Sequence, residues 1–376
     1  MTISQSQLTP PPCLNASALT DLHENQYAII DDFLPLSFAN QLLDDANRLY
    51  AQNYFQQHYF QFGGSLLKKP NIHELDLTDP KIASRRQQQQ QQQQSSRIDL
   101  GQWENVIQSL GPSFVSKINE LESHLQRRRQ KQHPNSTCHP FPPLSLDTQT
   151  PPAIKLQLNT GGGSFPWHYD NPGPPNQRSL TCVVYLNPHW KDGDGGEIVL
   201  WPFLSPSRKI TPLHRRAVLF WSDRVLHRVL PSRSDVKRVC FSMWCHGERG
   251  VVNSKEETVL SKDVLRFGSY DEAEAFFRRS ALQRVISRAV YGEEYLESLL
   301  ECLVVGGRRR RNENENENEN EDGKEEKEEL EDEGMLSKEE EEKVVRQHEA
   351  NVAAIKTKLR PLIDEFRRRK DAFQSG

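Results

Sequence analysis

Three residues near the middle of the chain have the types and the spacing to bind one metal ion. His168 and Asp170 lie two positions apart, and His227 ends the stretch 220–227. Because residues i and i+2 of an extended strand project from the same face, the His168 imidazole and the Asp170 carboxylate would point into one space. Two histidines and one carboxylate, with other coordination positions open, are the ligand set of non-heme Fe(II) oxygenases. The pattern therefore predicts an iron site formed by these three side chains.

Arg238 is a candidate for binding an acidic co-substrate. It opens the apolar run 239–244, which is typical of a strand, and we expect this strand to run antiparallel to the one that carries His227. A guanidinium group matches the geometry of a carboxylate and can bind it bidentately. Alternation along the strand puts Trp244 on the same face as Arg238, so both are expected to look inward.

A second apolar run supplies two further candidates. Thr181 and Tyr185 share one face of the run 180–186, and a phenolic hydroxyl is a suitable hydrogen-bond donor to a carboxylate. Taken singly, each candidate also has a structural explanation: a core tyrosine, or an Arg238 that balances Asp235 at the surface. The combination of the triad with an arginine downstream favours a functional site.

The elements around these residues predict a mainly β fold with flanking helices. Many short strands separated by turn signals argue for a double-stranded β-helix, or jelly roll, as the core. The expected strands are 154–158, 180–186, 198–201, 210–212, 217–221 and 238–244. Glycines 161–163 are expected to form a tight turn before His168. A phosphate-binding loop is the alternative there, but the lysine and the helix of such loops are absent from the sequence.

The chain divides into five expected segments. Residues 1–24 are predicted to be a flexible leader, and residues 25–250 a catalytic domain with its core at 154–246. In that domain we expect a helix over 37–54 and another over 103–125, broken or kinked at Gly111 and Pro112. A helical extension at 251–306, an acidic Asn/Glu-rich linker at 307–343 and a terminal helix at 344–376 follow.

Two low-complexity runs are predicted to be disordered, and the terminal helix has two possible packing partners. The glutamine run 87–94 and the Asn/Glu alternation in 312–321 have no apolar face to bury, so both are predicted to be disordered. The terminal helix has heptad-like apolar spacing interrupted by Pro361, and it is expected either to fold back on the domain or to form a dimer seam. Residues 308–376 contain no evident ligand or strand, so their removal is expected to leave an active domain.

Composition and charge limit the possible partners and the cellular compartment. The net charge of −4 gives no general attraction to nucleic acid or membrane, and no apolar run approaches the roughly 18 residues that a membrane span needs. Six cysteines are scattered without a disulfide framework, which favours the cytoplasm or nucleus. A zinc site at Cys240, Cys245 and His246 is conceivable but lacks a second ligand pair.

The stretch 156–246 resembles the catalytic core of 2-oxoglutarate- and Fe(II)-dependent oxygenases of the prolyl 4-hydroxylase superfamily, and most of all the hypoxia-inducible-factor prolyl hydroxylases. The matching pieces are residues 168–172, 180–187, 195–197 and 219–224, with His227, Arg238 and Trp244. The resemblance implies Fe(II), with 2-oxoglutarate and O₂ as co-substrates and L-ascorbate as an accessory reductant. It also implies that Tyr185, Thr181, Arg238 and Trp244 form the 2-oxoglutarate pocket. Leu158 stands where the relatives carry a second co-substrate-binding tyrosine.

Three functions are compatible with the sequence. The first is hydroxylation of a prolyl residue in a protein or peptide, with decarboxylation of 2-oxoglutarate to succinate and CO₂. The second is hydroxylation of a small molecule at the same iron site. The third is a non-catalytic interaction protein built on the jelly roll, which the intact triad and Arg238 argue against. We expect no nucleic-acid or membrane partner, and the terminal helix could support self-association.

Overall fold

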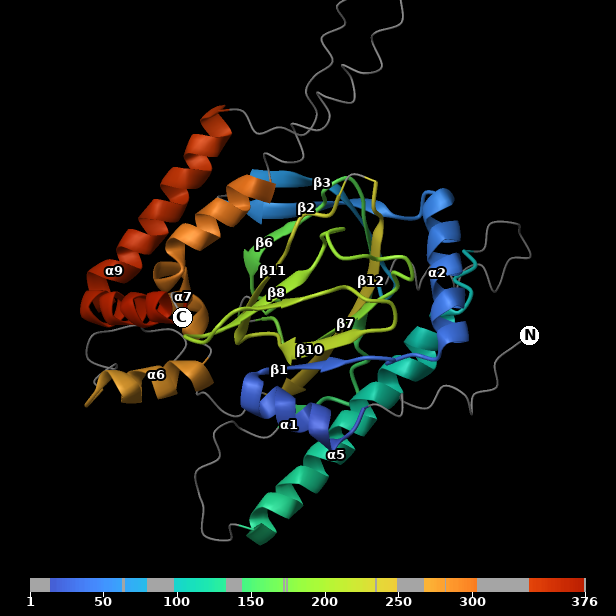
Figure 1. The fold of residues 1–376 in the computed structure, drawn as a ribbon, viewed down its shortest axis with the longest axis horizontal. Coiled ribbons are helices and arrows are strands. Elements are labelled where there is room, and N and C mark those ends of the chain that lie inside the picture. The colour runs from blue at the N-terminus through green and yellow to red at the C-terminus, as the bar shows by residue number, and fades with distance from the viewer. Residues whose placement is uncertain are drawn as a thin grey trace, which may run out of the picture.

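Two antiparallel β-sheets form the centre of the molecule (Figure 1). The computed structural model describes residues 14–62, 65–79, 98–132, 144–171, 173, 175–233, 235–248, 267–280, 282–302 and 338–374. The glutamine run 87–94, most of the acidic linker and residues 251–266 lie outside these ranges, so the predictions made for them stay predictions.

The larger sheet has the strand order β1-β10-β7-β12-β5-β3-β2, with β4 paired to β12. Its strands are β1 (Tyr27–Ile30), β2 (Gln56–Phe62), β3 (Ser65–Asp76), β4 (Ser145–Leu146), β5 (Ala153–Asn159), β7 (Arg178–Tyr185), β10 (Ala217–Trp221) and β12 (Arg238–Glu248). Seven of the eight residues of β7 are buried, as its near-continuous apolar sequence predicts for a strand covered on both faces.

The smaller sheet has the order β6-β11-β8-β9. Its strands are β6 (Phe165–His168), β8 (Ile198–Pro202), β9 (Arg208–Ile210) and β11 (Val225–Val229). Two antiparallel sheets built from short strands confirm the predicted jelly-roll core. One pairing was predicted wrongly: β12 pairs with β5 and β7 in the larger sheet, whereas β11 pairs with β6 and β8 in the smaller one.

Helices from the first third of the chain cover one side of the larger sheet (Figure 1). They are α1 (Ala16–Asn25), α2 (Leu36–Ala51), α4 (Trp103–Asn105), the π-helical turn η2 (Val106–Leu110) and α5 (Gly111–Gln132). The helix is not broken at Gly111 and Pro112, because η2 continues directly into α5. The π-helical turn lies immediately before this pair, and such turns are a common cause of helix kinks.

The predicted flexible leader is partly wrong. Asn15 caps α1 by accepting a hydrogen bond from the Ala18 amide at 3.1 Å. Leu22 is fully buried, and its carbonyl accepts a hydrogen bond from the Trp221 indole at 3.0 Å. Residues 16–25 therefore belong to the packed domain, because their apolar face is covered by the sheet edge and α5.

Helices from the last third of the chain form a second layer beside the smaller sheet (Figure 1). They are α6 (Tyr270–Arg279), α7 (Gln283–Val290), a helical segment at 292–302 and α9 (Lys338–Gln374). None of the described helices is both long and apolar enough to cross a membrane. As Pro361 predicts, α9 is kinked, with non-helical dihedral angles at Leu359.

Helix α9 folds back on the domain. Ile363 and Phe366 are fully buried in a hydrophobic cluster with Phe203, Phe277 and Tyr291. The Arg367 guanidinium donates to the Ala289 carbonyl of α7 at 2.9 Å. Helix α9 therefore completes the core of this helical layer, while the expectation that removal of residues 308–376 leaves an active domain stays a prediction.

Candidate active site

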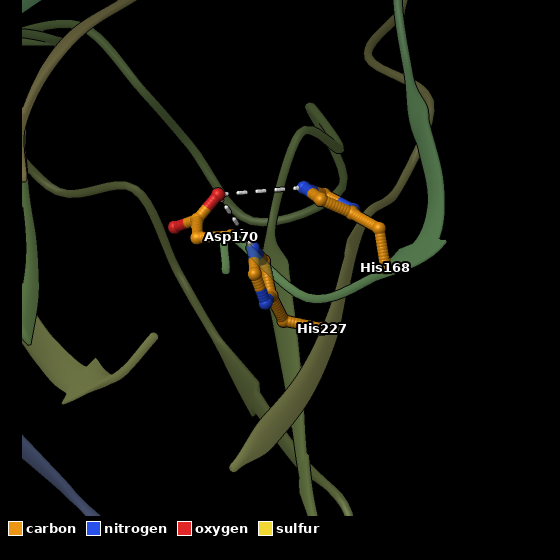
Figure 2. Close-up of side chains that lie close together, drawn as sticks. All are labelled: His168, Asp170 and His227. Atoms are coloured by element: carbon orange, nitrogen blue, oxygen red, sulfur yellow. Dashed lines mark ion pairs between the residues drawn. The ribbon is translucent and has the colours of Figure 1, made fainter. Parts of the chain in front are cut away.

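The β6–β11 pairing brings the two histidines together. His168 ends β6 and stands directly opposite His227 in the antiparallel register, and their ring centroids are 4.2 Å apart. Figure 2 shows both rings turned toward the Asp170 carboxylate. Asp170 Oδ1 lies 3.8 Å from His168 Nε2 and 3.7 Å from His227 Nε2. The predicted triad is therefore assembled from two neighbouring strands and the turn after one of them.

Backbone carbonyls orient both imidazole rings. His168 Nδ1 lies 2.8 Å from the Pro166 carbonyl oxygen, and His227 Nδ1 lies 3.1 Å from that of Val225. Since a carbonyl can only accept, each Nδ1 carries the proton and donates it. Each Nε2 then presents a lone pair to the space in front of Asp170, which is the tautomer that a metal ligand needs.

Asp170 lies beyond the end of β6 rather than within it. The alternation of side chains along a strand, from which its orientation was predicted, therefore does not fix the Asp170 side chain. Instead, Thr181 Oγ1 on β7 donates to Asp170 Oδ2 at 2.7 Å and lies 2.8 Å from Ser222 Oγ. The Asn171 amide donates to the Ser222 carbonyl at 2.9 Å, which fixes the turn. These bonds leave Asp170 Oδ1 directed at the two imidazoles.

The electrostatics favour neutral imidazoles beside a carboxylate anion. Desolvation in the cleft and the adjacent His227 lower the pKa of His168 to about 3. Burial likewise lowers the pKa of His227. Burial alone would raise the pKa of Asp170, but the two imidazoles and the Thr181 hydrogen bond outweigh it and lower that pKa. Metal ligation requires this protonation pattern.

This donor set fits Fe(II). One ligand atom from each of His168, Asp170 and His227 lies within 4.8 Å of the others, and no other potential metal-binding group of three occurs among the described residues. The conceived zinc site at Cys240, Cys245 and His246 is thus not formed. Two imidazoles and one carboxylate on one side of the ion leave positions open for co-substrates.

A cavity of about 610 Å³ opens in front of the triad and extends past Arg238. Arg238 is 2% exposed, and its Nε donates to the Gly196 carbonyl at 2.7 Å. At Gly196, where φ is +76°, an added Cβ would lie 2.8 Å from Arg238 Cδ, so this glycine makes room for the arginine. The guanidinium carbon lies 5.0 Å from the Tyr185 ring centroid. The guanidinium also interacts with the buried Tyr185 hydroxyl, for which no acceptor is found among the described residues.

A buried hydroxyl proton without an acceptor, next to a buried guanidinium, fits an acidic ligand. A carboxylate at this position would accept hydrogen bonds from both groups and balance the charge. The distal carboxylate of 2-oxoglutarate has this chemistry. The structure therefore brings Arg238 and Tyr185 together as the sequence predicted.

Two other predicted co-substrate residues have different surroundings. Trp244 lines the cavity, and the Arg178 guanidinium stacks on its ring at 4.1 Å. Thr181 is fully buried and bonded to Asp170, so its direct effect is on the carboxylate of the metal site. The assignment of Thr181 and Trp244 to 2-oxoglutarate stays a prediction.

Leu158 does not take part in the pocket. Its side chain is fully buried in the hydrophobic core on the opposite face of β5. Its neighbour Gln157 lines the cavity instead, with Oε1 3.7 Å from Cys240 Sγ. The position of Gln157 could have been predicted from the sequence, because Leu156 and Leu158 alternate with it along the strand and so lie on the other face.

The helical layer supplies a wall of the cavity that the sequence did not reveal. Arg284 and Arg288 of α7 line it, as do Tyr295 and Leu299. Helix α9 adds Gln347, His348, Asn351 and Val352. His348 Nε2 lies 2.8 Å from the Gly292 carbonyl, which ties α9 to this wall. Only the apolar periodicity of α9 hinted that it packs at all.

Comparison with known proteins agrees with this geometry. Residues 154–246 match the family described as the 2OG-Fe(II) oxygenase superfamily. A prolyl 4-hydroxylase of Phytophthora capsici is 28% identical, and the match covers 100% of this chain and 97% of that protein with a TM-score of 0.58.

Two more distant structures match part of the chain. A Trichoplax adhaerens prolyl hydroxylase in complex with a hypoxia-inducible-factor peptide is 21% identical, covers 61% of this chain and 87% of its own, and has a TM-score of 0.39. A Pseudomonas putida prolyl-4-hydroxylase is 16% identical, covers 62% and 98%, and has a TM-score of 0.40. Residues 154–246, which contain the triad, are therefore similar to the 2OG-Fe(II) oxygenase superfamily, and the triad has the ligand set that such an oxygenase uses to bind Fe(II).

Proposed function

We propose that this protein hydroxylates a prolyl residue of a protein or peptide. The observation that carries the proposal is the full-length match to the Phytophthora capsici prolyl 4-hydroxylase, which includes the helical layer as well as the jelly roll. In the proposed reaction, one oxygen atom of O₂ enters the C–H bond of the prolyl ring. The other enters succinate, which forms as 2-oxoglutarate loses CO₂.

The residues around the cavity have distinct roles in this proposal. His168, Asp170 and His227 hold Fe(II), which supplies the activation of O₂ that side chains alone cannot provide. Arg238 and Tyr185 bind the distal carboxylate of 2-oxoglutarate and thereby aim its keto-acid end at the metal site. Thr181 fixes Asp170 through its 2.7 Å hydrogen bond. Apolar and aromatic side chains limit access of water to the reacting centre.

The test is mass spectrometry of a proline-containing peptide library incubated with protein, Fe(II), 2-oxoglutarate and O₂. We expect addition of one oxygen atom to proline and an equal amount of succinate. Asp170→Ala, incubated in parallel, controls for non-enzymatic oxidation by iron. Decarboxylation of 2-oxoglutarate without modification of any peptide, together with oxidation of a small molecule, would replace the prolyl substrate with the small-molecule alternative.

Three further assignments belong to this proposal. O₂ is the oxidant, and L-ascorbate restores Fe(II) after turnover that is not coupled to substrate. The compartment is cytoplasmic or nuclear, and this is supported by the free, buried cysteines 182, 240, 245 and 302. The role of ascorbate is tested by measuring whether multiple-turnover activity depends on it. The compartment is tested by imaging the tagged protein in its source cells.

A further inference from the structure

The cavity in front of the triad is lined by an excess of cationic side chains. Arg238 and Asp170 are accounted for by the co-substrate and metal sites. The remaining Lys, Arg, Asp and Glu side chains that line it are Lys69, Lys155, Arg178, Arg284 and Arg288, against Glu74 alone. Glu74 is already engaged, because it accepts hydrogen bonds from Lys155 at 2.9 Å and His58 at 2.6 Å. The cavity lining therefore contains a surplus of basic over acidic side chains.

Arg178 lies at the inner part of this surplus, beside the metal site. Its guanidinium stacks on Trp244, and its Nη1 donates to the Asp170 carbonyl at 3.3 Å. No carboxylate among the described residues lies within salt-bridge distance of it. A half-buried guanidinium that is held in place by a ring and a carbonyl is prepared to bind an anion that enters the cavity.

Arg288 provides a second cation on the α7 wall. It is exposed at the cavity and, in the part of the chain that the structure describes, forms no salt bridge. Several other cations of this layer pair with glutamates of the chain, namely Arg278–Glu274, Arg367–Glu293, Arg369–Glu274 and Lys370–Glu294. Arg288 lacks such a pair and lines the cavity, so its guanidinium can bind a carboxylate that a ligand supplies.

We propose that the cavity takes an acidic peptide, in which Asp or Glu residues flank the residue to be hydroxylated. This rests on the proposed function and names the substrate class of the same site. One carboxylate pairs with Arg178 near the metal site, and a second pairs with Arg288 on the α7 wall. Bidentate arginine–carboxylate pairing sets the position of the peptide along the cleft, because it fixes direction as well as distance.

A peptide fits better than a nucleic acid. A phosphate backbone carries a charge at every nucleotide and is bound by a continuous basic surface. This chain has a net charge of −4, and the cavity that its basic side chains line also contains the apolar residues Phe165, Leu299 and Val352. Separate carboxylates on a partly apolar chain match that combination.

Binding to iron-free, full-length protein provides a test that does not depend on turnover. Fluorescence anisotropy would compare a labelled proline peptide flanked by Asp and Glu with its Asn/Gln counterpart. We expect the acidic peptide to bind roughly tenfold more tightly or better, since a hydrogen-bonded charged pair contributes about 1.5–3 kcal/mol. Affinity should fall with added salt.

Charge reversal identifies the arginine involved. In Arg288→Glu the preference should shift toward a peptide with Lys at the flanking position, by roughly two- to tenfold for an exposed pair. Arg346→Gln on α9 is the matched control, because Arg346 is exposed, is paired with Glu342 and lies outside the cavity lining. It should leave peptide selection unchanged.

The outcomes separate the two proposals. Equal affinity for acidic and neutral peptides, or unchanged selection in Arg288→Glu, overturns the acidic-peptide inference even if 2-oxoglutarate is consumed. Tighter binding of a single-stranded oligonucleotide than of any peptide overturns it too. Selective binding of the acidic peptide by a protein that never hydroxylates it would support the cleft assignment and refute prolyl hydroxylation.

Discussion

Replacing Phe366 with alanine should destabilise the protein far more than the same change at Phe373. Both phenylalanines are on α9, but Phe366 is 0% exposed and Phe373 is 47% exposed. The Phe366 ring packs edge-on against Phe203 and Phe277, with centroids 5.4 and 6.0 Å away. Truncation of a buried phenylalanine to alanine costs about 3–5 kcal/mol, including the cavity it leaves.

The assay is urea unfolding followed by circular dichroism. We expect the free energy of unfolding to fall by about 3–5 kcal/mol for Phe366→Ala and by no more than about 0.5 kcal/mol for Phe373→Ala. If α9 unfolds before the jelly roll, the loss will appear as a separate early transition.

The same variant has a functional consequence. Because α9 carries Gln347, His348, Asn351 and Val352 in the cavity wall, its loosening should weaken peptide binding more than 2-oxoglutarate binding. Equal stability of the two alanine variants would refute the docking of α9 described above. It would support the prediction that residues 308–376 can be removed from the catalytic domain.

Three further predictions concern single side chains. Arg238→Ala should raise the KM for 2-oxoglutarate roughly tenfold to a hundredfold, because the charge-assisted hydrogen bonds to its carboxylate are lost. The Fe(II) affinity, measured by anaerobic titration, should change much less. An unchanged KM would show that Arg238 does not bind the carboxylate. Thr181→Val should weaken Fe(II) binding roughly tenfold or more by freeing the Asp170 carboxylate, and equal Fe(II) affinity would show that this hydrogen bond is dispensable. Burial lowers the pKa of Lys69 from 10.5 to about 7, so the unfolded chain holds a proton between these pH values that the folded protein has released. Stability of the wild type relative to Lys69→Met should therefore rise with pH across this window, by at most about 1.4 kcal/mol per pH unit, and parallel stability curves from urea unfolding would contradict the shift.

The metal site was predictable from sequence because its signal is chemical and mostly local. His168 and Asp170 are separated by one residue, and the stretch 220–227 ends in the second histidine. What holds Asp170 was not predictable in the same way. The Thr181 and Ser222 contacts join residues that are far from Asp170 in sequence, and only the sheet order brings them together.

The jelly roll and most of its strands also followed from sequence, but their pairing did not. Alternation shows which side chains share a face, yet it does not say which strand lies beside which. That is why β12 was expected beside β11 and lies in the other sheet. The inward face of β12 was nevertheless correct, since Arg238, Cys240, Ser242 and Trp244 all line the cavity.

The C-terminal helix shows where pattern reasoning reached its limit. Heptad-like spacing correctly indicated an apolar face on α9, and it is equally compatible with a second chain or with the same domain. The complementary surface around Phe203 and Tyr291 comes from distant parts of the sequence. Its fit to α9 is a property of the folded domain, as is the contribution of α9 to the active-site wall.

The central claim is that His168, Asp170 and His227 bind one Fe(II) that supports consumption of 2-oxoglutarate. The direct measurement is succinate production by anaerobically reconstituted wild type and Asp170→Ala after exposure to O₂, with Fe(II) stoichiometry determined on the same samples. We predict about one Fe(II) per wild-type chain, as a single triad implies, and loss of succinate production in the variant. Iron-dependent succinate production that survives in Asp170→Ala would contradict the assignment of this site.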